Sequence, residues 1–212
     1  MVLGMGFAVA AAVILAIIVA QVFGPRLRRS AIGKRLQAGS LQISDRASVT
    51  MFGTIRAIGP ELIEAPLSGR SCVVAHAQAE LPEIDARSDL PENVMLTTRR
   101  MIPFELDTPS GIVLVDGTEA DLDFKPARVP QRSVERERAF IVAHGRGVQI
   151  AATATFREVV LTPGMRVAVH GVAMIEVAEQ GGERGYRDAA PTRTRLVAHP
   201  NYPIAIGMPR AP

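Results

Sequence analysis

The chain opens with a long apolar stretch before its pattern changes to short alternating segments. No charged residue occurs from Val2 to Phe23, a run of 22 residues in which Gln21 is the one strongly polar side chain. As a helix rising about 1.5 Å per residue the run would reach about 33 Å, and a bilayer's hydrocarbon core is about 30 Å thick. Gly24-Pro25 would end this helix, because proline lacks an amide donor. The pattern predicts a transmembrane anchor over residues 1–24.

A cleaved signal peptide is the alternative for this stretch. Signal peptides carry basic residues before the apolar run and small residues at a cleavage site after it. Here the basic residues come after the run, and residues 20–23 end in bulky side chains. A buried core helix would seldom be apolar on every face over this length. The membrane anchor is therefore the preferred interpretation.

A basic cluster follows the apolar stretch, and residues 1–44 contain no acidic residue. The cluster consists of Arg26, Arg28, Arg29, Lys34 and Arg35. Because short basic flanks stay on the cytoplasmic side, we expect a single-pass protein of the plasma (inner) membrane with its short N-terminus outside and its C-terminal domain in the cytoplasm. The cluster could also contact anionic lipid headgroups. Residues 25–44 are expected to be a basic juxtamembrane connector, with an amphipathic or irregular segment over 31–44.

From residue 45 onward, runs of β-branched and aromatic residues alternate with turn residues, and no long segment has a clean 3.6-residue period. The expected extended segments are 49–58, 71–80, 102–106, 112–115, 119–124, 140–144, 149–161, 165–177 and 196–206. The clearest is 165–177, in which Val167, Val169, Gly171 and Ala173 share one face. Short strands with frequent turns predict an all-β domain over residues 45–212, either an OB-like barrel or a sandwich.

Three polar stretches interrupt these segments and are expected to be surface loops. They cover residues 81–100, 126–138 and 179–195, and the second could contain one short helix. Residues 107–111 are expected to join the two strands on either side as a five-residue hairpin loop.

The distribution of charge narrows the class of partner. The chain's formal net charge is +3, and residues 1–44 contribute +5, so residues 45–212 carry 3 − 5 = −2. Aromatic residues make up 4% of the chain and tryptophan is absent. A barrel could bind single-stranded nucleic acid, but a near-neutral domain with few aromatic rings does not favour it. We therefore expect no nucleic-acid partner.

Residues able to carry out chemistry are few. Cys72 is the single cysteine of the chain, which excludes an internal disulfide. Cys72 and His76 are four apart in one expected strand, so both should point to the same face and could form a nucleophile pair. The competing interpretation is a buried, unreactive thiol, because free cysteine is among the most buried residue types.

Other candidate motifs are incomplete. The four acidic residues Asp116, Glu119, Asp121 and Asp123 could bind a cation, but they lack the spacing of a calcium loop. Residues 145–147 (GRG) lack the third glycine of a dinucleotide fingerprint, and the four histidines, at positions 76, 144, 170 and 199, show no metal-ligand spacing. The sequence therefore predicts no catalytic residue, no metal site and no cofactor.

A series of short motifs resembles, in order, the GIDE domain, also called BAM for "beside a membrane". The motifs are residues 53–55 (GTI), 65–73 (APLSGRSCV), 103–107 (PFELD) with 111–116 (GIVLVD), and 157–158 (RE) with 161–171 (LTPGMRVAVHG). The resemblance covers about residues 48–206. It implies an all-β, partly barrel-like domain next to a bilayer, in a RING-less member of the group related to mitochondrial membrane-anchored E3 ubiquitin ligases.

The resemblance does not extend to ligase chemistry. Family members with that activity have two membrane helices and a RING finger, which needs about eight Cys and His ligands for two four-coordinate zinc ions. This chain has one apolar span, one cysteine and four histidines. It also has Ser71 where proline is usual and Phe156 where tyrosine is usual.

Within the resemblance, the motif turn is expected to lie between two strands, with Gly69 at positive φ. Its residues are Pro66, Leu67, Ser68, Gly69, Arg70 and Cys72. We expect a non-catalytic binding or scaffold module that contacts the lipid bilayer and a protein partner. Its contact surface would be the loops around residues 68–70 and 81–100. The alternatives are a thiol-dependent or hydrolytic enzyme using Cys72 and His76, an OB-like nucleic-acid binder, and a ligase-related protein without catalysis.

Overall fold

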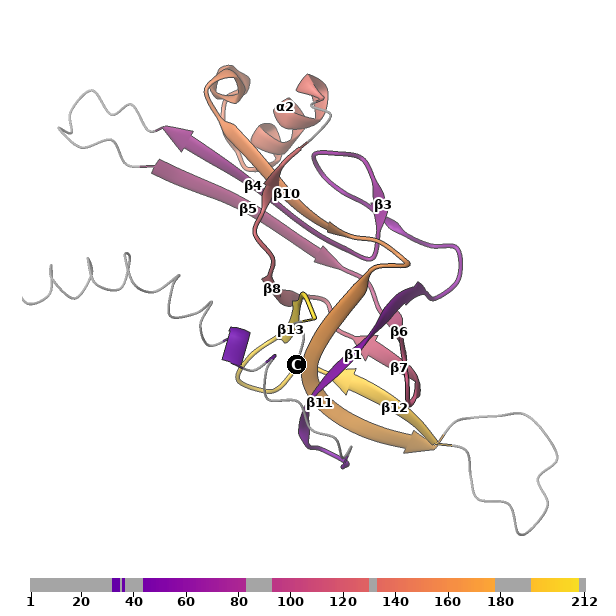
Figure 1. Cartoon of the computed structure of the whole chain (residues 1–212). Coiled ribbons are helices and arrows are strands. Elements are labelled where there is room, and N and C mark those ends of the chain that lie inside the picture. Colours follow the sequence, from indigo (N-terminus) through magenta and orange to yellow (C-terminus); the bar gives the residue numbers. More distant parts are fainter. Residues whose placement is uncertain are drawn as a thin grey trace, which may run out of the picture.

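The computed structural model describes residues 32–34, 36, 44–82, 93–129, 133–177 and 192–209 (Figure 1). The strands are β1 (Ser48–Ala57), β2 (Ile63–Glu64), β3 (Ser71–Cys72), β4 (Val74–Pro82), β5 (Asn93–Met101), β6 (Phe104–Thr108), β7 (Gly111–Asp116), β8 (Ala120–Asp123), β9 (Ala127–Arg128), β10 (Thr155–Leu161), β11 (Arg166–Val177), β12 (Thr192–Val197) and β13 (Ile204–Gly207). They are accompanied by α2 (Val134–Ala143) and the 3-10 helix η1 (Val148–Ala152). The prediction of an all-β domain is confirmed.

Five strands close into a barrel-like sheet. β1, β6 and β7 form an antiparallel meander, β7 pairs in parallel with β12, and β12 pairs with β11, which returns to β1. The ring closes because β1 pairs with β11 through residues 48–54 and with β6 through residues 54–57. β13 and β8 extend the sheet from the edge of β11.

Gly53 lies where β1 passes from one partner to the other. A Cβ atom at this position would lie 2.5 Å from the main-chain oxygen of Asp107 in β6. Only glycine lets the two backbones approach this closely, so the barrel closes at a residue without a side chain.

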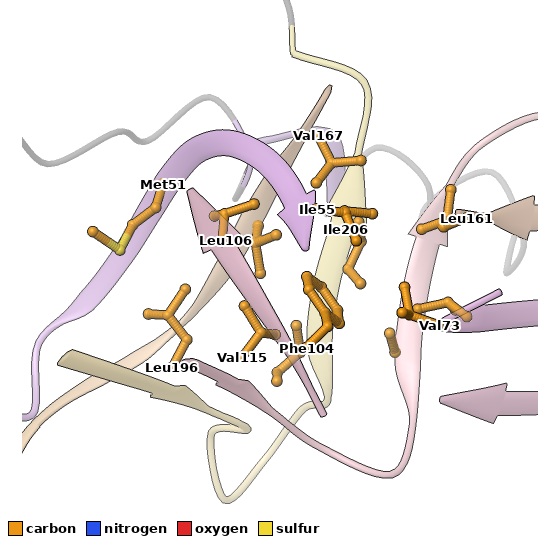
Figure 2. Close-up of a cluster of buried hydrophobic side chains, with 14 of the residues drawn as sticks. Met51, Ile55, Val73, Phe104, Leu106, Val115, Leu161, Val167, Leu196 and Ile206 are labelled. Carbon is orange, nitrogen blue, oxygen red and sulfur yellow. The ribbon is translucent and has the colours of Figure 1, made fainter. Parts of the chain in front are cut away.

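The barrel core follows the alternation expected of half-buried strands. Val167, Val169 and Ala173 of β11 all point inward, as predicted. Phe104 lies in the middle of the cluster and is fully buried (Figure 2). The same cluster includes Val73 and Leu161 from outside the barrel, so one core continues into the rest of the domain.

Two insertions between barrel strands build a second layer. Residues 58–103 lie between β1 and β6, and residues 117–165 lie between β7 and β11. Together they supply a four-stranded sheet in the order β5-β4-β10-β9, with α2 packed against one face (Figure 1). Phe140 and Ile141 of α2 are buried against this sheet.

Most predicted strands are observed, and three predicted segments are wrong. Residues 140–144, expected to be extended, belong to α2 and the turn after it, because their apolar side chains are buried by a helix packed on the four-stranded sheet. The expected loop 81–100 contains β5, whose exposed positions are polar apart from Met95. The expected loop 179–195 likewise contains the start of β12.

The remaining differences are smaller. Residues 149–154, expected to be extended, form most of η1 and the turn after it. The hairpin between β6 and β7 turns through two residues rather than five, because Asp107 and Thr108 continue β6. Segment 196–206 is divided between β12 and β13.

The connector before the barrel is partly described. Residues 32–34 and 36 are helical, and Ile32 and Leu36 are buried against Ala168 and Ala205 on the outside of the barrel. Their spacing of four residues places both side chains on one face of the helix. At these positions the segment is helical with one buried apolar face, and Lys34 is exposed.

The predicted anchor over residues 1–24 and the other four residues of the basic cluster lie outside the described residues. Among the described helices, none is both long and apolar enough to cross a membrane.

Replacing Gly53 by alanine tests the closure of the barrel. The added methyl group would meet the backbone of β6, so we expect the free energy of unfolding to fall by about 1–3 kcal/mol. Thermal unfolding of the full chain in detergent measures this loss. Thr54→Ala, which removes atoms at the next position, is the control, and equal stability of the two variants would contradict the role of Gly53.

Candidate functional site

The motif turn lies between β2 and β3 and is closed by its own backbone. Ala65 N–H donates to the carbonyl of Arg70, and Gly69 N–H donates to that of Ala65, both at 2.9 Å. Gly69 has φ of +69°, as predicted. It also lies against Arg136 of α2, whose Cζ is 2.7 Å from where a Cβ would stand. Glycine is needed here for the backbone conformation, whereas the flexible side chain of Arg136 could move away from an added methyl group.

A buried carboxylate forms hydrogen bonds to the backbone of this turn. Glu158 of β10 is 8% exposed. Its Oε1 accepts a hydrogen bond from Leu67 N–H at 2.8 Å, and its Oε2 accepts one from Ser68 N–H at 3.1 Å. Hydrogen bonds to an ionised acceptor are stronger than neutral ones, and the two oxygens are both occupied. The shape of the turn is therefore fixed by a residue about ninety positions later in the chain.

An open groove of about 260 Å³ lies between this turn, α2 and β5. Ala65 and Pro66 come from the turn, and Ala139 and Ala143 come from α2. Thr98 and Arg100 of β5 also line the groove. Of the contact surface that the sequence indicated, Thr98 and Arg100 from segment 81–100 line the groove, whereas none of residues 68–70 does. Residues 83–92 of that segment lie outside the described residues.

Polar contacts fix the groove at both ends. At one end, Arg136 Nη2 donates to Glu64 Oε1. At the other, His144 Nδ1–H donates to the carbonyl of Phe140 at 2.8 Å, and its Nε2 lies 3.2 Å from both Thr98 Oγ1 and the carbonyl oxygen of Thr97. These contacts join α2 to the turn and to β5, so the groove is formed before any ligand arrives.

The groove carries a net positive charge. Glu64 neutralises Arg136, whereas the guanidinium of Arg100 has no ion pair or hydrogen bond within the described part of the chain. Two arginines and one glutamate give 2 − 1 = +1. A carboxylate of a ligand would therefore find a donor at Arg100.

Cys72 is buried and poorly suited to act as a nucleophile. Its Sγ donates to the carbonyl of Ile63 at 3.5 Å. Burial, followed by repulsion from Glu158, raises the pKa of the thiol to about 11, although Arg70 acts in the opposite direction. The thiol is therefore protonated at neutral pH.

The predicted shared face of Cys72 and His76 is wrong. The strand is broken at Val73, so Cys72 packs beside Ala75 instead of following the alternation of β4. His76 Nε2 accepts from Gln78 Nε2 at 3.1 Å, and none of the hydrogen bonds among the described residues joins it to Cys72. Burial and then Arg99 lower the pKa of His76 to about 4, so this ring is neutral at neutral pH.

Two of the four acidic residues considered for a cation, Asp116 and Asp121, are engaged with arginines. Asp116 accepts from Arg195, and Asp121 pairs with Arg99 at 3.4 Å. Across the described ranges, no group of three or more His, Cys, Asp or Glu side chains could hold a metal ion.

Comparisons with protein-family models, with curated proteins and with solved structures found no match to this chain. The resemblance to the GIDE domain therefore stays a prediction from the motifs.

Glu158→Gln tests the support of the turn. The amide keeps the size of the side chain, but its NH₂ group would face a backbone N–H, so one buried donor loses its acceptor. We expect the free energy of unfolding to fall by about 1–3 kcal/mol, measured by denaturant titration. Arg157→Gln, at the exposed neighbouring position, is the control. A variant as stable as this control would show that the carboxylate does not hold the turn.

The thiol of Cys72 gives a second test. A pKa of about 11 instead of 9.0 means a thiolate fraction about 100-fold smaller at pH 8, so a thiol reagent should label the folded chain at least about 100-fold more slowly than the unfolded chain. Mass spectrometry follows the labelling, with chain unfolded in denaturant as reference. Equal rates would contradict the buried, protonated state of Cys72.

Proposed function

We propose that this chain is a single-pass, membrane-anchored binding module whose β domain holds a protein partner at the surface of the bilayer, without catalysis of its own. The observation that carries this proposal is the preformed groove beside the motif turn. Its turn is held by Glu158 and its walls are joined by His144 and Arg136. A surface that is already ordered loses little conformational entropy when a partner binds.

The chemistry of the groove narrows the class of partner. Ala65, Ala139 and Ala143 leave room for short side chains, and Arg100 offers an unpaired guanidinium, as judged within the described residues. The partner would present a carboxylate next to small apolar groups, because an arginine recognises a carboxylate through two parallel hydrogen bonds.

The membrane part of the proposal is supported by the connector. Ile32 is packed on the barrel, and it follows Phe23, the last residue of the apolar run, by nine positions. At about 3.3–3.6 Å per residue, nine steps along the chain span at most about 32 Å. If the apolar run crosses the bilayer, the barrel lies within that distance of it. The basic cluster favours the cytoplasmic side of the plasma membrane for the domain.

The architecture we propose is OB-like and belongs to the GIDE group. Three consecutive antiparallel strands, with the third parallel to the last, form a closed Greek-key barrel of five strands. Gly53, Gly69 and Glu158, all in the quoted motifs, each have a structural role in this fold. These roles support the family assignment, whereas no part of a RING is proposed.

Nucleic acid is not the proposed partner. Three arginines of the barrel strands are paired with acidic residues, which reduces the cationic surface open to phosphates. The pairs are Arg56 with Asp107, Arg193 with Glu105, and Arg195 with Asp116 and Glu176.

Site-specific photo-crosslinking in intact membranes tests the groove. A photoreactive residue at Ala143, which lines the groove and is exposed, should give an adduct with the partner. Arg100→Glu should abolish that adduct, because it reverses the charge that would bind the partner's carboxylate. Arg138→Glu makes the same reversal at an exposed position of α2 outside the groove and should leave the adduct unchanged. An adduct that survives both reversals, or no adduct at all, would contradict the proposal.

A further inference from the structure

Two large apolar side chains are exposed near the docked connector. Phe52 of β1 is 41% exposed and Met208, directly after β13, is 58% exposed. Phe52 is opposite Ala168 in the register of β1 and β11, and Ala168 is opposite Gly207 in that of β11 and β13. Phe52, Ala168 and Gly207 therefore form one row across the outer face, and Met208 follows Gly207 directly in the chain.

The connector is seated in the middle of this row. Ile32 and Leu36 are buried against Ala168 and Ala205. Leu36 Cδ1 lies 2.5 Å from where a Cβ of Gly207 would stand, so the absence of a side chain at Gly207 makes room for it. This contact fixes the position of Ile32 and Leu36 on the barrel.

The charges on this face are mostly basic. Lys34 is exposed on the connector, and Arg166 is exposed on β11 in the row next to Phe52. Asp123 of β8 is also close, with its Cβ 3.2 Å from where a Cβ of Gly207 would stand. These three residues sum to 2 − 1 = +1, to which the rest of the basic cluster adds four positive charges close by in sequence. Apolar side chains ringed by basic ones match the boundary of an anionic bilayer.

We propose that the outer face formed by Phe52, Met208, Lys34 and Arg166 rests on the anionic cytoplasmic leaflet, with Phe52 and Met208 in the headgroup region. This inference rests on the proposed membrane anchoring. It gives the domain one orientation on the membrane. In Figure 1, α2 lies at the opposite end of the domain from β1 and the connector, so the groove beside α2 stays open to the cytoplasm.

Depth-dependent quenching in vesicles tests the orientation of the full chain. Phe52→Cys and Met208→Cys supply labelling positions on the proposed face. Val134→Cys and Val142→Cys supply matched positions on α2, where both valines are exposed. Cys72 is fully buried, so the unsubstituted chain serves as the labelling background. Each variant carries a polarity-sensitive fluorophore and is reconstituted in vesicles of phosphatidylcholine and phosphatidylserine with a quencher on the lipid headgroups.

We expect fluorescence at positions 52 and 208 to shift to the blue and to lose most of its intensity, and fluorescence at positions 134 and 142 to stay unquenched. In vesicles of phosphatidylcholine alone the contrast should shrink, because Lys34 and Arg166 lose their anionic partners. Undiminished contrast there would overturn the role given to these charges.

Flotation of the vesicles distinguishes a wrong orientation of the domain from a failure of membrane anchoring. If the chain floats with the vesicles but all four positions are quenched alike, the orientation is overturned and the anchoring stands. If the chain does not float, the membrane part of the proposed function fails with it.

Discussion

The structure depends on one strand serving two partners. β1 pairs with β11 along its first part and with β6 along its last, and this double pairing turns a row of strands into a closed ring. Closure removes two sheet edges and encloses the fully buried side chains around Phe104. It also sets a geometric condition at Gly53, where the backbone of β6 comes too close for any side chain. The insertions that form the second layer begin and end at strands held in this ring.

The groove depends on this arrangement through contacts between residues far apart in the sequence. Glu158 reaches the turn only because β10 pairs with β4, which continues from the turn through β3. A buried carboxylate with both oxygens hydrogen-bonded to backbone amides is a stable way to hold a loop that has little regular structure of its own. The binding surface is consequently rigid on the turn side, and its variable chemistry comes from the side chains of α2 and β5.

Some elements of this structure are predictable from the sequence and others are not, and the difference has physical reasons. β1 and β11 were predictable because their inward residues alternate on the two-residue period of a strand. The segment 140–144 was not, since a short apolar run is compatible with a buried helix or a buried strand. β5 is harder to predict, because an edge strand can keep polar residues on its exposed positions and then resembles a loop.

In the site, the glycine at position 69 is enough to predict the turn. The hydrogen bonds from Glu158 to Leu67 and Ser68 could not be predicted from the local pattern, because the residues are far apart in the sequence. One signal was present: Glu158 shares the inward row of β10 with Phe156, where a charged residue is unexpected. Cys72 and His76 do not share a face because the break at Val73 interrupts the strand alternation over residues 71–80, and the sequence pattern does not reveal this break.

The groove is a composite of two separate pieces of the polypeptide. Its turn and β5 belong to the stretch that interrupts the barrel after β1, and α2 belongs to the stretch that interrupts it after β7. A synthetic peptide of residues 65–73 would therefore contain the motif of the turn without the groove that the motif helps to form. Deleting either insertion would remove one side of the groove, even if the remaining barrel still folded. The recognition that we propose at this groove would thus depend on the assembled tertiary structure, and it should be lost on unfolding and restored on refolding.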